Sequence, residues 1–147
     1  MSDERTYPQR PFLAVSAAII RDGKVLLVRR ARKPALHLYT LPGGAVEAGE
    51  TLMQAVSREV REETSLEIEP VALAGHREVI ARDAQGRVER HFVILSFAAR
   101  WRAGEPVLNE ELDDARWLTP TELTGLQTTE GLAEIVAAAI GLFAQPD

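Results

Sequence analysis

Two pairs of apolar runs, each interrupted by a turn signal, constrain the fold of this chain more than any other feature of its sequence. The first pair, residues 12–20 and 24–30, is joined by Arg21-Asp22-Gly23. Asp-Gly between strand-like runs favours a tight hairpin, because the turn needs positive φ values. The second pair, residues 66–80 and 87–101, flanks a turn-forming segment. We therefore predict two antiparallel hairpins, the second longer than the first.

Helical signals separate and follow these hairpins. Thr51, with Gln54 three residues later, matches a capping box and predicts that a helix starts near Thr51. The Leu-Pro-Gly-Gly sequence of residues 41–44 predicts a loop before it. Later, residues 115–118 resemble a short strand, Thr119-Pro120 opens a helical turn, and residues 130–143 carry apolar side chains at helical spacing. The order strands, helix, strands, helix predicts an α/β (α+β) fold with a mixed sheet between helices.

Length, charge and cysteine content limit the class of protein. A chain of 147 residues with 46% hydrophobic content predicts one domain over residues 1–147, with residues 1–10 as a flexible or loosely packed arm. No apolar run approaches the roughly 18 residues of a membrane span, and the polar N-terminus does not fit a secretory signal. The absence of cysteine excludes disulfides and thiolate metal sites. We therefore expect a cytoplasmic protein that has no membrane partner.

The net charge of −5 bears on the partner of the protein. Binding to a nucleic-acid polymer depends on Lys and Arg side chains that neutralise phosphates, so an acidic chain argues against that partner. A small phosphate-bearing ligand remains compatible with this charge if a metal ion supplies local positive charge.

Three glutamates on the predicted helix occupy an unusual position. At 100° per residue, Glu59 and Glu63 fall within about 20° of Leu52, and Glu62 lies about 80° away. This arc is also the expected apolar stripe of the helix, which consists of Leu52, Met53, Val56 and Val60. The acidic cluster therefore overlaps the side of the helix that should be buried.

Two interpretations of this cluster are open. Surface ion pairs such as Arg58 with Glu62 contribute about 0.2–0.5 kcal/mol, but they leave the like-charged pair of Glu59 and Glu63 unexplained. A divalent cation such as Mg²⁺ explains both, because it takes oxygen ligands and is held by carboxylates together with substrate phosphates. Gly43 and Gly44, just before the helix, are expected to take positive φ and to let the backbone approach a ligand.

These residues can be matched to a family. Residues 44–66 resemble the Nudix box of the Nudix (MutT-like) hydrolases, G-x5-E-x7-R-E-U-x-E-E-x-G-U, where U is a bulky aliphatic residue. Ser65 departs from the pattern, since it stands where the family has a glycine suited to a left-handed helix cap. The matching positions are Gly44, Glu50, Arg58, Glu59, Val60, Glu62, Glu63 and Leu66. The resemblance implies a Nudix-type α/β/α sandwich with a mixed central β-sheet.

The resemblance also implies residue roles and a cofactor. It implies hydrolysis of a nucleoside diphosphate linked to another moiety, by water, with Mg²⁺ or Mn²⁺ bound. Arg58 would hold the glutamates in place, and Glu50 would act as a support for them or as a catalytic acid. The implied catalytic residues are Glu50, Arg58, Glu59, Glu62 and Glu63. The implied metal ligands are Glu59, Glu62, Glu63 and the backbone carbonyl of Gly44.

A catalytic base and further substrate contacts are expected outside the box. In parts of the family a carboxylate from a later loop acts as the base, and residues 109–117 offer Glu110, Glu111, Asp113 and Asp114, although a solvated acidic loop explains them equally well. Arg29 and Arg30 alternate at a strand end, so one of them should face the site. The expected substrate-binding residues are Arg29, Arg30, Gly43, Gly44 and Glu111.

The sequence leaves the substrate open. The chain resembles the small ADP-ribose pyrophosphatase-like group, which favours ADP-ribose or a sugar nucleotide. Two alternatives remain: a MutT-type hydrolase of normal or oxidised nucleoside triphosphates, and a non-catalytic nucleotide sensor. Four aromatic residues are base-stacking or core candidates: Tyr39, Phe92, Trp101 and Trp117. A homodimer is an expectation from the resemblance alone.

Overall fold

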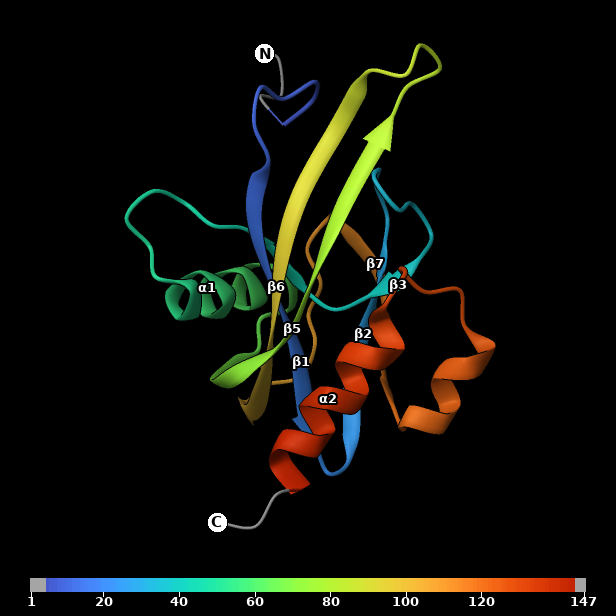
Figure 1. Cartoon of the computed structure of the whole chain (residues 1–147). Helices are drawn as coiled ribbons and strands as arrows, with labels where there is room; N and C mark the ends of the chain where they lie inside the picture. Colours follow the sequence, from blue (N-terminus) through green and yellow to red (C-terminus); the bar gives the residue numbers. More distant parts are fainter. Residues whose placement is uncertain (1–4, 145–147) are drawn as a thin grey trace.

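The computed structural model describes residues 5–144 and has a mixed seven-stranded sheet at its centre (Figure 1). The strands are β1 (Phe12–Arg21), β2 (Lys24–Arg30), β3 (Tyr39–Thr40), β4 (Gly43–Ala45), β5 (Glu67–Arg82), β6 (Val88–Ala103) and β7 (Leu112–Leu118). The helices are α1 (Leu52–Thr64), the 3₁₀ helix η1 (Pro120–Gly125) and α2 (Leu132–Ala144).

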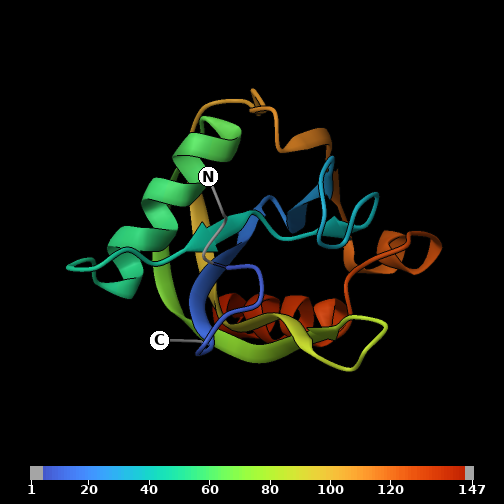
Figure 2. The same ribbon diagram turned by 90° about the horizontal axis from the view of Figure 1, so that it is seen from above.

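The sheet order is β3-β2-β1-β6-β5, with β4 paired to β1 and β7 paired to β2. The pair of β1 and β6 is parallel and the other pairs are antiparallel, so the sheet is mixed. Figure 2 shows α1 and α2 on opposite sides of this sheet. The expectation of an α/β/α sandwich with a mixed central sheet is confirmed.

The two expected hairpins are both present. Asp22 and Gly23 have φ values of 51° and 76°, so the first turn uses the positive φ that its sequence predicts. The second hairpin pairs β5 with β6 along almost their whole length and forms the long yellow-green arm in Figure 1. Thr51 caps α1 through a complete capping box, as predicted.

Each helix covers its own apolar core. The core under α1 includes Val15, Ile19, Leu26, Val56, Val60 and Phe97. The core under α2 includes Ala18, Leu27, Ala98, Ile135 and Val136. Met53, expected in the buried stripe of α1, is 39% exposed, because burial of this helix begins only at Ala55, after its first turn.

The prediction of a loop at residues 41–44 is wrong for Gly43 and Gly44. Both belong to β4, which pairs with β1, and neither has the positive φ that the sequence suggested. Gly43 lies so close to β1 that an added Cβ atom would be 2.0 Å from the carbonyl oxygen of Val15. The glycine is needed for close strand approach rather than for an unusual turn.

The C-terminal cap of α1 and the N-terminal segment are also well defined by hydrogen bonds. Ser65 takes the left-handed conformation (φ 65°) that suits glycine, and its N–H still donates to the carbonyl of Arg61, so the helix cap is intact. Residues 1–4 of the predicted arm lie outside the described residues, whereas Tyr7 donates its hydroxyl hydrogen to Asp83 near the tip of the second hairpin. Within residues 5–144, no helix has the length and hydropathy of a membrane span.

Candidate active site

Arg58 is the centre of the glutamate cluster. Its Nε and Nη2 donate to the two carboxylate oxygens of Glu50 at 2.6 and 2.8 Å. Its Nη1 donates to Glu59 at 3.0 Å and to Glu62 at 3.2 Å, and Nη2 also reaches the carbonyl of Ala45. This bidentate bond lowers the pKa of Glu50 from 4.5 to about 2. One guanidinium therefore fixes three box carboxylates and ties α1 to β4.

Glu63 is the buried member of the cluster. Its side chain is on the sheet side of α1, only 3% exposed, and it accepts a hydrogen bond from the Gly43 N–H at 2.9 Å. Burial, together with the neighbouring carboxylates of Glu111 and Glu59, raises the pKa of Glu63 from 4.5 to about 8, although the hydrogen bond from Gly43 opposes this shift. The site therefore holds a carboxyl whose charged form a bound cation would stabilise.

Gly44 provides the space that Glu59 occupies. A Cβ atom on Gly44 would lie 2.3 Å from Oε2 of Glu59, so only glycine lets this carboxylate rest against β4. Burial also raises the pKa of Glu59, partly offset by its hydrogen bond to Arg58. Glu62, by contrast, has a side chain that is 56% exposed and lies at the rim of the cluster.

One of the four later carboxylates joins the cluster. The Asn109 N–H donates to the carbonyl of Glu63, which ties the loop before β7 to the end of α1 and places Glu111 beside the Glu63 carboxyl. The other three pair elsewhere: Glu110 with Arg32, Asp113 with Arg29, and Asp114 with Tyr39 and Arg116. Only Glu111 has the position expected of the proposed base.

The oxygen donors of Glu59, Glu63, Glu111 and the Gly44 backbone fit a hard divalent cation such as Mg²⁺ or Mn²⁺. The pKa values of Glu59 and Glu63 are raised because Glu63 is buried, Glu59 is half-buried, and both lie near other negative charge. Within residues 5–144, no three acidic or histidine side chains already form a closed metal cluster. Glu50, Glu59 and Glu62 are instead hydrogen-bonded to Arg58.

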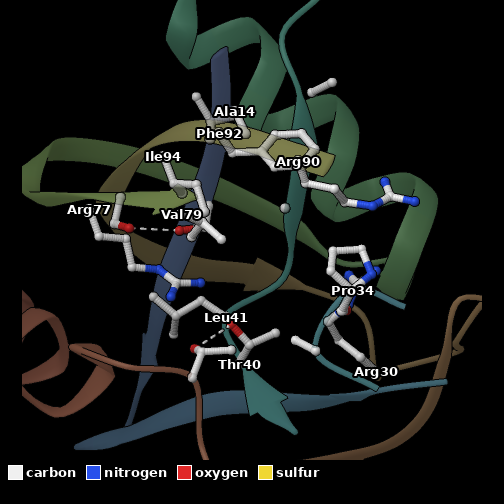
Figure 3. Close-up of a pocket in the computed structure, with 18 of the residues that line it drawn as sticks. Ala14, Arg30, Pro34, Thr40, Leu41, Arg77, Val79, Arg90, Phe92 and Ile94 are labelled. Carbon is white, nitrogen blue, oxygen red and sulfur yellow. Dashed lines mark hydrogen bonds between the residues drawn. The ribbon is translucent and has the colours of Figure 1, made fainter. Parts of the chain in front are cut away.

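A cavity of about 560 Å³ opens beside the cluster, and Figure 3 shows part of its lining. Glu63, Glu111, Gly43 and Gly44 form its acidic end. Arg30 lines the cavity, whereas Arg29 pairs with Asp113 at 2.6 Å outside it. The alternation at the end of β2 therefore brings one arginine to the site, as the sequence suggested.

The sequence interpretation missed most of the cavity wall. Phe92 is the one expected stacking candidate that lines the cavity, since Tyr39, Trp101 and Trp117 do not. The missed lining residues include Ser16, Thr40, Arg77, Arg90, Ser96 and Thr129. Ser16 and Ser96 each interrupt an apolar strand, and this polar interruption was the available signal.

Comparisons with known proteins agree with this fold. The family model described as NUDIX domain matches residues 10–139. The chain is 37% identical over 105 residues to an "ADP-ribose pyrophosphatase" of Methanocaldococcus jannaschii, covering 71% of this chain and 62% of that protein. It is 35% identical over 116 residues to an "NAD-capped RNA hydrolase NudC" of Stutzerimonas stutzeri (strain A1501), covering 78% of this chain and 39% of that protein.

A solved structure shares the same architecture. The MutT NUDIX hydrolase from Burkholderia pseudomallei superposes with a TM-score of 0.74 at 29% identity, covering 88% of this chain and 98% of that one. The chain belongs to the Nudix family. It spans less than two thirds of the length of the two curated relatives named above.

Proposed function

We propose that this chain hydrolyses the pyrophosphate bond of a nucleoside diphosphate linked to another moiety, with ADP-ribose and sugar nucleotides as the first candidates. The observation that carries the proposal is the buried Glu63 carboxyl, which opens with Gly43 and Glu111 into a cavity of about 560 Å³. The name of the Methanocaldococcus jannaschii relative, "ADP-ribose pyrophosphatase", supports this substrate class. We further propose that the partner is a small nucleotide and that the protein acts in the cytoplasm.

The metal in this proposal is Mg²⁺ or Mn²⁺. Glu59 and Glu63 would be its main carboxylate ligands, with the Gly44 carbonyl and Glu62 as additional donors. When bound, such a cation polarises phosphoryl oxygens and lowers the pKa of the attacking water.

The remaining roles belong to side chains that position or activate. Arg58 restrains Glu50, Glu59 and Glu62 by four hydrogen bonds, which fixes the ligands before the substrate arrives. Glu111 is the candidate base, because its carboxylate lies beside Glu63 at the open end of the cavity. Arg30 is placed to contact a substrate phosphate, since it lines the same cavity.

The test is product analysis on a substrate panel with Mg²⁺ and with excess EDTA. ADP-ribose, sugar nucleotides, dinucleoside polyphosphates, and normal and oxidised nucleoside triphosphates should be compared. ADP-ribose would give AMP and ribose 5-phosphate, whereas a triphosphate would give a monophosphate and pyrophosphate and would favour the MutT-type alternative. Turnover that persists in EDTA would exclude the metal-dependent reaction, and metal binding without any turnover would favour the sensor alternative.

A variant pair tests the metal assignment separately. Glu63→Gln keeps the volume and the bond from Gly43 but removes the ligand charge. In the parent protein, Mn²⁺ at 100 times its Kd should stabilise the fold by about 2.7 kcal/mol, which corresponds to roughly 5–10 °C in Tm. The variant should show almost no shift and almost no turnover. Glu67→Gln is the matched control, because Glu67 is an exposed partner of Arg61 outside the cavity.

A further inference from the structure

Arg77 is a cationic side chain that the proposed reaction does not use. It extends from β5 into the cavity and is half-buried, and in Figure 3 its guanidinium points toward Leu41 and Thr40. Its Nη1 donates to the backbone carbonyl of Glu130 at 3.2 Å. Among residues 5–144, no carboxylate forms an ion pair with it. Most of its five N–H donors are therefore available to a ligand.

Two hydroxyl pairs line the same cavity. Ser16 and Ser96 are hydrogen-bonded at 2.7 Å, and Thr40 and Thr129 at 3.0 Å. Within each pair one hydroxyl donates to the other, which leaves one O–H per pair to donate elsewhere. Together with Arg77 they make this wall rich in donors, and the described carboxylates of the lining, Glu63 and Glu111, belong to the acidic end.

The register of the sheet separates this wall from the glutamate cluster. Gly43 pairs with Ser16, Ser16 with Ser96, and Ser96 with Gly75, which lies two residues before Arg77. Three strand spacings of about 4.8 Å place the Cα atoms of Gly43 and Gly75 roughly 14 Å apart. The Arg77 side chain therefore starts from the strand opposite the glutamate cluster, and we infer that a group held there belongs to a different part of the ligand from a diphosphate beside Glu63.

The charge of the cavity indicates what that group is. The chain carries a net charge of −5, yet the lining of its cavity includes three cationic side chains for which no ion pair with a carboxylate is found among residues 5–144: Arg30, Lys33 and Arg77. Loss of solvation lowers the pKa of Arg77, and the nearby Glu130 carboxylate offsets only part of this effect. An anionic group relieves this cost more fully than the neutral edge of a nucleobase.

We propose that Arg77 and the two hydroxyl pairs form a second anion subsite, which binds a phosphate monoester on the substrate away from the scissile diphosphate. The preferred substrate is then a diphosphate-linked nucleotide that carries one additional phosphate. This inference rests on the proposed pyrophosphohydrolase function and specifies its substrate class.

The experiment compares substrates that differ by one phosphate. Values of kcat/KM with Mg²⁺ are measured for NAD⁺ and NADP⁺, dephospho-coenzyme A and coenzyme A, and ADP-ribose and its 2′-phosphate. The proteins are the parent, Arg77→Met, Arg77→Lys and the control Arg82→Met. Arg82 is also on β5 but lies outside the cavity lining. Thermal unfolding verifies that each variant is folded.

The parent should prefer the phosphorylated member of at least one pair by on the order of 10- to 100-fold, the effect of a charge-assisted hydrogen bond. Arg77→Met should abolish this preference and leave the unphosphorylated member within about 3-fold of the parent. Arg77→Lys should retain part of the preference, because it keeps the charge but loses the bidentate geometry. Arg82→Met should behave like the parent.

Several results would overturn the subsite. They are the absence of a preference in every pair, an equal loss for both members in Arg77→Met, and Arg77-dependent inhibition by free inorganic phosphate without any preference among nucleotides. Cleavage of unphosphorylated substrates without preference removes the subsite but keeps the proposed function. If no substrate is cleaved, the proposed function fails. Calorimetry with AMP and adenosine 3′,5′-bisphosphate then still decides the subsite. The bisphosphate must bind more tightly than AMP to the parent protein, and this difference must be absent in Arg77→Met.

Discussion

Gly44→Ala tests the close contact between β4 and the glutamate cluster. The new Cβ atom would lie 2.3 and 2.8 Å from the two carboxylate oxygens of Glu59, whereas ordinary contacts are about 3.5 Å. The carboxylate must therefore move by about 1 Å, which is easy for the end of a flexible side chain. Because a 1 Å error at a reacting centre costs on the order of 100-fold, kcat should fall by that factor. The free energy of unfolding should fall by no more than about 1–2 kcal/mol.

The assay pairs initial rates under saturating Mg²⁺ with urea unfolding, and two glycines provide controls. At Gly43 the added Cβ would meet backbone atoms of Val15 and Ser16 at 2.0–2.9 Å, so Gly43→Ala should destabilise the fold severely. At Gly141, within α2, nothing lies within 4 Å, so Gly141→Ala should keep parental activity and gain up to about 1 kcal/mol of stability. The reasoning is refuted if Gly44→Ala retains the parental kcat, or if it unfolds as readily as Gly43→Ala.

Two further predictions concern the ends of α1. The hydrogen bonds from Arg58 hold the pKa of Glu50 at about 2, so the contribution of this ion pair to stability is complete above pH 4.5 and is lost as pH falls toward 2. In urea unfolding between pH 6 and 2.5, Glu50→Gln should make the free energy of unfolding less dependent on pH. An unchanged pH dependence would contradict the ion pair. Ser65 has a left-handed backbone and a hydrogen bond from its hydroxyl to the Val107 carbonyl, so Ser65→Gly should relieve strain and lose that bond. We expect a net gain of up to about 1 kcal/mol in calorimetry with unchanged kcat, whereas a clear drop in Tm would show that the hydroxyl bond dominates.

Local signals in the sequence determined the first hairpin, the start of α1 and the burial of Glu63. Each of these features depends on residues only a few positions apart: the positive φ of Asp22 and Gly23, the capping bonds of Thr51 and the 100° rotation per helical residue. The glutamate cluster could also be predicted from local signals, because its residues lie on one helix and the loop before it.

The tertiary structure alone decided how the cavity is built. Gly43 pairs with β1, which is distant in sequence but adjacent in space. This pairing makes a strand of a segment that the sequence predicted to be a loop. Glu111 rather than Asp113 faces Glu63, because the backbone bond from Asn109 to Glu63 fixes the loop that carries it. Arg77 reaches the cavity because β5 follows the register of β6 beside β1. Contacts between distant segments depend on strand pairing and packing, which no local pattern encodes.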